Sequence, residues 1–290
     1  MIVAGLTGGL GNQLFEYALA RRISHDRGLP LKLDITGFDI YRLHAYSLQN
    51  FSIRQEFADP AEVSRLKSIG RRHFLTRRIQ KLLPINRRTW IVERQFKFDP
   101  LILRTTRRQL YLQGYWQSEE YFKDIRPILL RELMVTTEPD AVNREFAARI
   151  SELQAVSLHI RRGDYVTNST TAKVHGVMPL NYYHHAVREI SDLVPNPHFF
   201  IFSDDPPWAR DHLALELPFT IMGHNAADRN YEDLRLMALC RHHIIANSSF
   251  SWWGAWLCQN PDPIVFAPEK WFSDSSLDTS DLIPSRWRRI

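Results

Sequence analysis

The chain has 290 residues, of which 44% are hydrophobic and 24% are charged, and its formal net charge is +5 at pH 7. This composition is ordinary for a globular protein, and the length allows two domains of the usual size. Every apolar run falls short of the roughly 20 residues that a helix needs to cross a membrane. The sequence therefore excludes a helical integral membrane protein as well as a disordered chain.

Two further observations concern the compartment. Met1 leads directly into an expected strand, without the charged region and apolar core of a signal peptide. Cys240 and Cys258 both lie in apolar helical surroundings and predict no disulfide framework. We therefore expect a cytoplasmic protein.

Positive charge is concentrated in the segment from Arg65 to Arg108, where only Glu93 and Asp99 oppose it. Such a segment could meet nucleic acid, an anionic lipid surface or a phosphorylated acceptor, or it could be a solvated helical face. Aromatic residues are too sparse in it for a platform that stacks bases. We favour a surface role, with peripheral contact at the inner face of a membrane as one form of it.

The amino-terminal part reads as strand, glycine-rich turn, helix and strand. Residues 2–6 predict the first strand, Asn12 is expected to cap a helix that ends near Gly28, and residues 31–35 predict the next strand. Glycine-rich turns of this kind bring backbone N–H groups close to anions. The glycines at 8, 9 and 11 do not have the G-x-G-x-x-G spacing, so a dinucleotide-binding dehydrogenase is disfavoured against a simple tight turn.

The middle of the chain is less regular. Residues 89–93 and 109–113 predict short strands, and residues 121–133 and 141–153 predict helices. Residues 114–118 form an aromatic and polar cluster after a strand, which suits a sugar or else a half-buried surface patch. The polar stretch 136–140 is the expected boundary between an amino-terminal α/β domain, residues 1–140, and a carboxyl-terminal domain, residues 141–290.

From residue 155 the pattern becomes regular. Strands are predicted at 155–160, 198–202, 219–222, 243–246 and 264–267, and helices near 181–193, 208–215, 231–241 and 250–258. Strands that alternate with helices predict a parallel sheet covered on both faces. Ligands bind such sheets at the carboxyl ends of the strands.

Polar residues follow the strands of this half at the expected binding edge. They are His159 at the end of the first strand with Arg161, Arg162 and Asp164 after it, Ser203, Asp204 and Asp205 after the second, Asp233 at a helix start, and Asn247, Ser248 and Ser249, followed by the aromatic Phe250, after the fourth. Arginine matches a phosphate with a fixed fork of donors, and hydroxyl and N–H groups at a helix start cradle one. A carboxylate accepts hydrogen bonds from a guanine edge. The pattern predicts a site for a nucleoside diphosphate.

Simpler interpretations stand beside this one. An ion pair of Arg161 or Arg162 with Asp164 would explain the first loop, and helix capping would explain residues 247–251. Asp204 and Asp205 could bind a metal, but no further ligand stands at a metal-binding spacing, and arginine can neutralise a departing diphosphate alone. Ser249 lacks the G-x-S-x-G pattern of a serine nucleophile. We expect neither a metal nor a cofactor.

Several blocks of the sequence resemble the bacterial α-1,2-fucosyltransferase family. They are Gly8-Gly-Leu-Gly-Asn-Gln-Leu-Phe15, His159-Ile-Arg-Arg-Gly-Asp-Tyr165, Phe202-Ser-Asp-Asp205, Asp233, and Ala246-Asn-Ser-Ser-Phe-Ser-Trp-Trp-Gly-Ala-Trp256, in this order. The resemblance runs from the first strand almost to the end and is weakest over residues 40–110.

The resemblance implies a GT-B-like α/β fold of two Rossmann-like domains facing across a cleft, with the acceptor side in residues 1–140 and GDP-fucose bound by residues 141–290. It also implies inverting, metal-independent transfer of L-fucose from GDP-β-L-fucose to the 2-hydroxyl of a terminal galactose on an oligosaccharide or glycolipid. By position, Arg161 resembles the arginine on the donor β-phosphate, and His159 and Asp233 resemble guanine-side contacts. Ser248 and Ser249 resemble hydroxyls near the diphosphate, while Gly11 and Asn12 belong to the glycine-rich motif facing the reacting centre.

On this interpretation Arg161 and residues 247–250 stabilise the departing GDP, and a base or water takes the proton of the acceptor hydroxyl. Asp164 is the acid inside the central motif, although it could merely orient an arginine. More distant fucosyltransferases have a glutamate slightly further along, where this chain has residues 167–170. The base and the residues that bind the acceptor therefore remain open. The alternatives are a transferase for another nucleotide sugar and, in a different class, a nucleic-acid-binding module that uses residues 65–108.

Overall fold

The computed structural model describes residues 1–39, 43–68, 83–168, 172, 174–274 and 277–290, without the side chain of Asp164. It contains two compact units. Unit 1 comprises residues 1–136 and 278–282, and unit 2 comprises residues 137–277 and 283–290. The main division thus falls at the edge of the polar stretch 136–140, and a short carboxyl-terminal segment joins unit 1 in addition.

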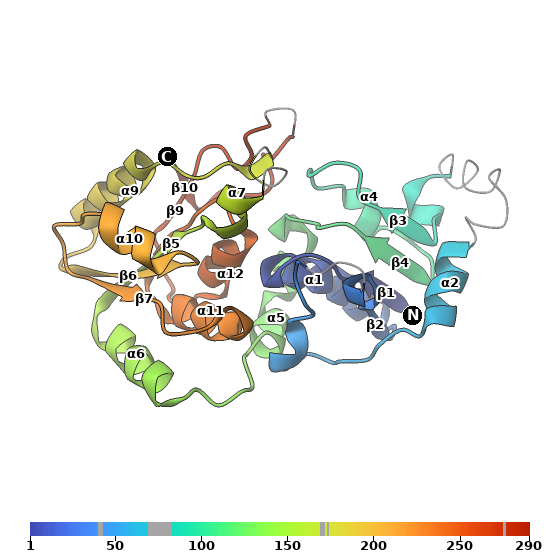
Figure 1. Ribbon diagram of the computed structural model, residues 1–290. Helices are drawn as coiled ribbons and strands as arrows, with labels where there is room; N and C mark the ends of the chain where they lie inside the picture. Colours follow the sequence, from blue (N-terminus) through green and yellow to red (C-terminus); the bar gives the residue numbers. More distant parts are fainter. Residues whose placement is uncertain (40–42, 69–82, 169–171, 173, 275–276) are drawn as a thin grey trace. The chain divides into compact units, whose positions relative to one another are not determined.

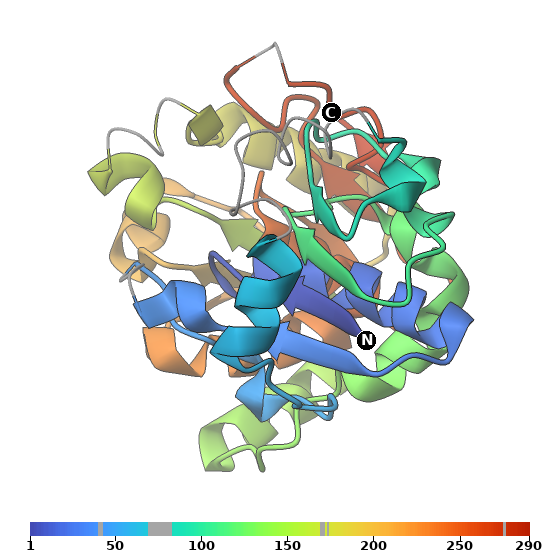
Figure 2. The same cartoon turned by 90° about the vertical axis from the view of Figure 1, so that its right-hand side faces the viewer.

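Unit 1 is built on a four-stranded parallel sheet in the order β2-β1-β4-β3 (Figures 1 and 2). Its strands are β1 (Ile2–Gly5), β2 (Leu31–Asp34), β3 (Trp90–Val92) and β4 (Leu110–Gln113). All four lie within the ranges predicted for strands. Helix α1 (Leu10–Arg27) connects β1 to β2, and helix α2 (Pro60–Ser68) packs Val63 and Leu66 against Val3 and Tyr111 of the sheet.

Helix α1 ends as predicted but does not begin as predicted. Gly28 adopts the left-handed conformation at φ 58° and donates its N–H to the carbonyl of His25, a termination that glycine permits without strain. The amino-terminal cap is Gly9 rather than Asn12, and it makes no side-chain hydrogen bond. Asn12 lies inside the first turn, and its amide oxygen accepts a hydrogen bond from Gln117 instead, so the predicted capping role was wrong.

The predicted helix over residues 121–133 is shorter than expected. The regular helix is α5 (Arg126–Glu132), and residues 119–125 form two 3-10 turns before it. Pro127 explains the difference: it lacks a backbone N–H and is favoured in the first turn of a helix rather than its interior. Helix α4 (Pro100–Leu103) begins in the same manner, with Asp99 as its cap.

Unit 2 is built on a six-stranded parallel sheet in the order β10-β9-β8-β5-β6-β7. The strands are β5 (Gln154–Ile160), β6 (Pro197–Ser203), β7 (Phe219–Met222), β8 (His242–Ile244), β9 (Val265–Ala267) and β10 (Arg288–Arg289), and the helices of at least seven residues are α6 (Ala141–Glu152), α9 (Leu180–Leu193), α10 (Pro206–His212), α11 (Asn230–Leu239) and α12 (Ser249–Leu257). The alternating pattern is confirmed. The two-residue strand β10 was not predicted, because it is too short to carry a periodic signal.

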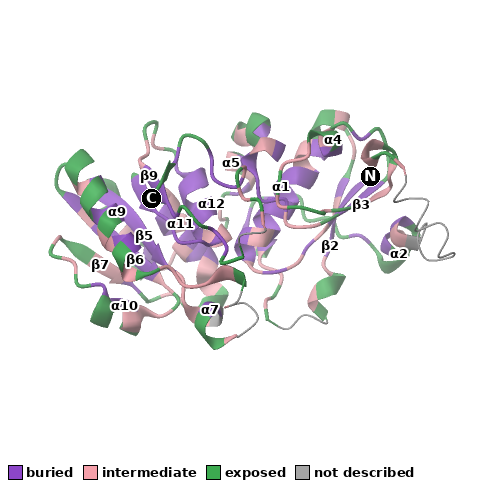
Figure 3. Cartoon of the chain, turned by 90° about the horizontal axis from the view of Figure 1, so that it is seen from above, coloured by how far each residue is buried: buried purple, intermediate pink, exposed green. Residues whose placement is uncertain are grey.

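Side-chain alternation along β5 and β6 divides the core of unit 2 between two faces. Val156, Leu158 and Ile160 pack with α9 and α10, whereas Ala155 and Phe200 pack with α6 and α11. Successive side chains of a strand point to opposite faces, so a strand covered on both sides must be apolar throughout. Figure 3 shows these strands in the colour of buried residues.

The basic segment is not one continuous helix over its described part. Helix α2 ends at Ser68, residues 85–87 form a 3-10 turn, and β3 follows at Trp90. Arg71, Arg72, Arg77, Arg78 and Lys81 lie outside the described residues. Among the residues that are described, no helix combines the length and the apolar character required to cross a membrane.

Candidate functional site

The candidate site of unit 2 lies where β5, β6 and β8 end. β5 stands between β6 and β8, and all three run parallel, so the residues that follow them share one edge of the sheet. The expected site residues follow those ends: Arg161 after β5, Asp204 after β6, and Asn247 shortly after β8. Parallel pairing is therefore what gathers these residues.

Asp204 holds the backbone and side chain of the β5 loop together. Its Oδ2 lies 3.0 Å from Nη1 of Arg161, and its Oδ1 accepts a hydrogen bond of 2.8 Å from the backbone N–H of Arg162. A Cβ atom on Gly163 would come within 2.5 Å of Oδ2, so a glycine is needed for this approach. The arginine partner is thus Asp204, while the side chain of Asp164 lies outside the described part.

Arg162 is fixed differently from Arg161. Its Nε lies 3.3 Å from Oδ2 of Asp205, and its guanidinium stacks at 3.8 Å over the ring of Trp208 in α10. Asp205 also caps α10, and its backbone N–H donates to the Ser203 hydroxyl at 3.0 Å. Both carboxylates that the sequence marked as a possible metal pair therefore orient arginines. Ser203 supports the turn between them.

The loop after β8 is held by a hydrogen bond from Tyr165 and by hydrogen bonds from the side chain of Asn247. The Tyr165 hydroxyl donates to the carbonyl of Asn247 at 3.0 Å, and the Arg161 guanidinium lies 5.4 Å from the Tyr165 ring centroid. The Asn247 amide donates to the carbonyls of His175, Gly176 and Trp271. Asn247 is therefore a buried brace that shapes the loop.

Helix α12 begins directly after this brace. Ser248 caps it by accepting a hydrogen bond from the N–H of Phe250, whereas Ser249 and Phe250 are only partly buried. Trp252, Trp253 and Trp256 are almost completely buried and anchor the helix body in unit 2. The first turn, which carries the partly buried Ser249, thus stands on a rigid base, and the amino-terminal end of a helix suits an anion.

His159 lies beside Phe250 at the end of β5. The two ring centroids are 5.7 Å apart, and His159 is only 4% exposed. Burial, and to a lesser degree the charge of Arg161, lowers the pKa of His159 to about 3, so the ring is neutral. Its Nδ1 is buried without a hydrogen-bond partner among the described residues.

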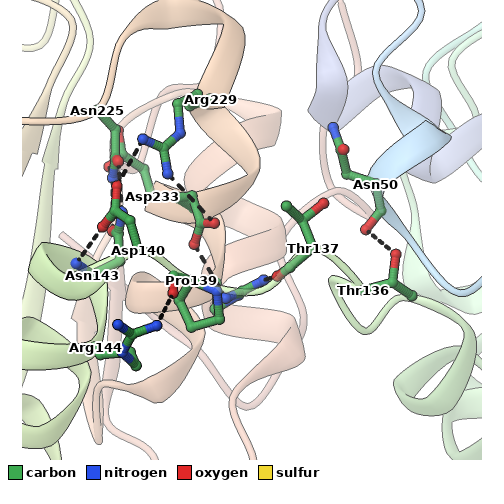
Figure 4. A network of polar contacts seen from close by, with 12 residues as sticks. Asn50, Thr136, Thr137, Pro139, Asp140, Asn143, Arg144, Asn225, Arg229 and Asp233 are labelled. Atoms are coloured by element: carbon green, nitrogen blue, oxygen red, sulfur yellow. Dashed lines mark hydrogen bonds and ion pairs between the residues drawn. The ribbon is translucent and has the colours of Figure 1, made fainter.

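Asp233 is held by an amide network in the first turn of α11 (Figure 4). Asn225 donates to Oδ1 of Asp233 at 2.8 Å, and Asn143 is hydrogen-bonded to Asn225. Asn143 is fixed in turn by Asp140, which pairs with Arg229 at 2.8 Å. Sequence reasoning missed these supporting residues, because they stand in two segments 82 positions apart and have no motif of their own.

Asp233 is connected to the other site residues through the core. It stands one helical turn before Met237, and Met237 and Phe250 belong to one apolar cluster. Gly11 and Asn12 belong to unit 1, in the first turn of α1. The structure thus joins His159 to Phe250 and Arg161 to Asp204 by direct contacts, and Tyr165 links Arg161 to Asn247. Asp233 lies on α11, the helix that contributes Met237 to the cluster with Phe250.

The comparison with protein families decides the identity of this fold. Residues 1–290 match the model of glycosyl transferase family 11. The chain belongs to this family. An alpha-1,2-colitosyltransferase from Escherichia coli is 34% identical, and the match covers 100% of this chain and 99% of that protein. A galactoside 2-alpha-L-fucosyltransferase from Caenorhabditis elegans is 26% identical over 67% of this chain and 57% of that protein.

Solved structures agree with this family 11 fold. NodZ alpha-1,6-fucosyltransferase, soaked with GDP-fucose, matches with a TM-score of 0.51 at 17% identity, covering 91% of this chain and 94% of that one. A FUT1 mutant from Arabidopsis thaliana, in complex with GDP, matches with a TM-score of 0.55 at 11% identity, covering 95% and 72%. The expected GT-B-like α/β class is confirmed, and the protein is a glycosyltransferase.

The carboxyl group of Asp233 gives a test of the site's electrostatics. Burial, with a smaller contribution from the charge of Glu232, raises its pKa to about 6 against the hydrogen bond from Asn225, whereas an unfolded chain has a value of about 3.9. The folded protein therefore retains a proton that the unfolded chain loses between these two values. The stability that Asp233 contributes is complete below the lower value and is lost as the pH rises through about 6.

We expect Asp233→Asn to remove this loss, because asparagine can still accept the hydrogen bond from Asn225 but does not ionise. Between about pH 4 and about pH 6, the free energy of unfolding of the wild type should fall relative to that of the variant. Above about pH 6 the difference should stay constant, because Asp233 is then ionised in both the folded and the unfolded wild type. Urea unfolding at several pH values measures it. A pH-independent difference would contradict the raised pKa.

Proposed function

We propose that this family 11 glycosyltransferase transfers L-fucose from GDP-β-L-fucose to the 2-hydroxyl of a terminal galactose, with inversion at the sugar. The observation that carries the proposal is the placement of Arg161 beside the Asn247 loop at the carboxyl edge of unit 2. A guanidinium and the first turn of α12 together offer charge and N–H donors to a diphosphate. The names of the relatives supply the sugar and the linkage.

The donor would be held by three kinds of contact. Arg161, oriented by Asp204, faces the β-phosphate, and the first turn of α12 with Ser248, Ser249 and Phe250 receives the phosphate oxygens. Asp233 accepts hydrogen bonds from the guanine edge, and the neutral His159 offers a ring nitrogen on the same side. Arg161, Ser248 and Asp233 are each held by a contact within the protein, so their positions do not depend on the ligand.

Chemistry follows from where charge develops. As the glycosidic bond breaks, negative charge grows on the diphosphate, and the fixed guanidinium of Arg161 stabilises it without reorganisation. The sugar acquires oxocarbenium character, and inversion requires the acceptor hydroxyl on the opposite face, with a base or water taking its proton. No group of three His, Cys, Asp or Glu side chains that could hold a metal occurs among the described residues. Metal independence remains a prediction, which transfer in the presence of EDTA tests.

Replacing Arg161 tests the core of this assignment. We expect Arg161→Ala to lower kcat/KM for GDP-fucose by roughly 100-fold or more, because a fixed donor at a developing charge is lost. Arg161→Lys should recover only part of the activity, since a lysine lacks the planar fork. Arg188→Ala, an exposed arginine on α9, is the matched control. Near-wild-type transfer by the alanine variant would overturn the assignment.

A second candidate donor comes from the colitosyltransferase, which matches the whole chain at 34% identity. Colitose differs from fucose by the absence of the 3-hydroxyl, so one site could hold either sugar. We expect a higher kcat/KM with GDP-fucose than with GDP-colitose, measured with lactose as the common acceptor. The opposite order would make colitose the natural donor. Thermal stabilisation by GDP but not by UDP would exclude uridine-linked sugars in the same series.

Unit 1 carries a groove that fits the expected membrane contact. It has a volume of about 610 Å³ and is lined by Arg87, Thr89, Thr106, Arg107, Arg108 and Gln109. It lies at the edge where β3 and β4 begin, opposite to the glycine-rich turn after β1. Arg107 donates to the carbonyl of Arg87 at 2.7 Å, which holds the two segments of the groove together.

We infer that this groove contacts anionic phospholipid headgroups. Arg107→Ala combined with Arg108→Ala should weaken sedimentation with vesicles of phosphatidylcholine and phosphatidylglycerol by roughly fivefold for each arginine. Vesicles of phosphatidylcholine alone provide the control for charge, and transfer to lactose in solution should remain unchanged. Equal sedimentation with both kinds of vesicle would remove the idea, and tight, salt-dependent binding of an oligonucleotide would favour the nucleic-acid alternative.

A further inference from the structure

The turn after β4 in unit 1 has two residues at positive φ, a glycine that adopts it freely and a tryptophan that is strained. Gly114 has φ 153°, and a Cβ atom there would lie 2.2 Å from Cβ of Glu93. Trp116 has φ 55°, in the left-handed region that bulky side chains avoid, and it is only 1% exposed. Such conformations persist where the surroundings enforce them, and they gather at functional sites.

Glu93 enforces this turn from the end of β3. Its Oε2 accepts a hydrogen bond of 2.7 Å from the N–H of Tyr115, and its Oε1 accepts one of 3.0 Å from the N–H of Trp116. Each carboxylate oxygen has capacity for a further donor. The carboxyl group of Glu93 therefore lies at the carboxyl edge of the sheet. Burial disfavours its charged form and raises its pKa to about 7.

The glycine-rich turn after β1 reaches the same edge. Parallel pairing places Gly5 of β1 and Val92 of β3 opposite Gln113 of β4, so the loops after these strands leave the sheet together. Across this edge the Gln117 amide donates to Oδ1 of Asn12 at 2.9 Å. This hydrogen bond joins the residues 114–118 to the first turn of α1.

Two buried oxygen atoms near this junction have no hydrogen-bond partner among the described residues. They are Oε1 of Gln117 and Oε1 of Glu16, whose residues are 7% and 1% exposed. The other oxygen of Glu16 accepts the N–H of Thr7 at 2.8 Å, and the charge of Glu93 reaches Glu16. A buried acceptor without a partner is costly, so Oε1 of Gln117 suits a donor from a ligand. Burial raises the pKa of Glu16 well above its usual value, so its second oxygen carries a proton and donates instead.

An aromatic surface stands beside these acceptors. The rings of Phe96 and Tyr115 are stacked with centroids 6.4 Å apart and planes 21° apart, and both residues are partly exposed. The backbone N–H of Tyr115 is the one that Glu93 holds, so the ring position follows from the strained turn. A pyranose has an apolar C–H face that packs on such rings and hydroxyl groups that donate to carboxylate and amide oxygens.

We propose that this edge of unit 1 binds the acceptor sugar as a neutral hexopyranoside, with its C–H face on Phe96 and Tyr115 and its hydroxyls toward Glu93 and Gln117. The inference rests on the proposed function, because it names the acceptor-binding residues of the same transferase. It also explains why the aromatic and polar cluster 114–118 follows a strand end. Glu93 positions the turn, while Tyr115 and Gln117 determine affinity for the sugar.

The test uses Tyr115→Ala and Gln117→Leu, which keep the backbone N–H groups that Glu93 binds. Each variant should raise KM for lactose by roughly tenfold, since a single ring contact or polar partner is lost. KM for GDP-fucose and thermal stabilisation by GDP should stay within about twofold of wild type, because both report on unit 2. Phe57→Ala and Gln55→Leu, on exposed side chains elsewhere in unit 1, are the matched controls.

Lactose binding without a donor separates this proposal from the function it rests on. Saturation-transfer NMR should show lactose bound to wild type and to both controls, and weakened in both variants, whichever nucleotide sugar the enzyme uses. Unchanged lactose KM and unchanged saturation transfer in folded variants would overturn the acceptor site and leave the fucosyltransferase proposal standing. Bound lactose with no transfer from GDP-fucose would reject the donor and retain the acceptor site.

Discussion

The parallel pairing of β5 with both of its neighbours is the constraint on which the site in unit 2 depends. Register places Ser157 opposite His243, and these side chains form a buried hydrogen bond of 2.8 Å. Burial lowers the pKa of His243 to about 3, so the ring is neutral and the bond carries no charge into the core. A slip by one residue would turn every side chain of β5 to the opposite face and move Arg161 away from Asp204.

At the carboxyl edge of this sheet, each of two neighbouring arginines has its own carboxylate partner. Arg161 and Arg162 stand on adjacent positions, yet one pairs with Asp204 and the other with Asp205 and the ring of Trp208. The partly exposed pairs contribute little to stability, and their value lies in fixing the direction of two guanidinium groups. Arginine suits this role because it stays protonated in any of these settings. The buried tryptophans of α12 provide the matching rigidity for the loop across the edge.

Both sheets carry their polar residues at the carboxyl ends of the strands, but the residues differ in charge. In unit 2 the carboxyl edge presents positive charge and helix N–H groups, which suit a diphosphate. In unit 1 the corresponding edge presents Glu93, two amides and the Phe96–Tyr115 pair, which suit an uncharged ligand rich in hydroxyls. A transferase needs both kinds of recognition, and the proposed division assigns one kind to each unit.

Much of this could be read from the sequence, because periodic apolar strands and glycine turns are local signals. The strands of both sheets other than the two-residue β10, the end of α1 at Gly28 and the family motifs follow from residues close together in the chain. The start of α1 could not be read in this way. Asparagine often caps helices, but the side chain of Asn12 accepts a hydrogen bond from Gln117, which is more than one hundred positions away in the sequence.

The sequence by itself determined the class of fold, the family and the loops that carry polar residues, since each depends on short stretches of the chain. Tertiary structure alone decided the partners: Asp204 for Arg161, Asn225 and Asn143 around Asp233, and Glu93 for the turn at Trp116. The physical reason is that a hydrogen bond or ion pair requires two atoms within a few ångströms. Residues distant in sequence reach that separation only when strands pair and helices pack.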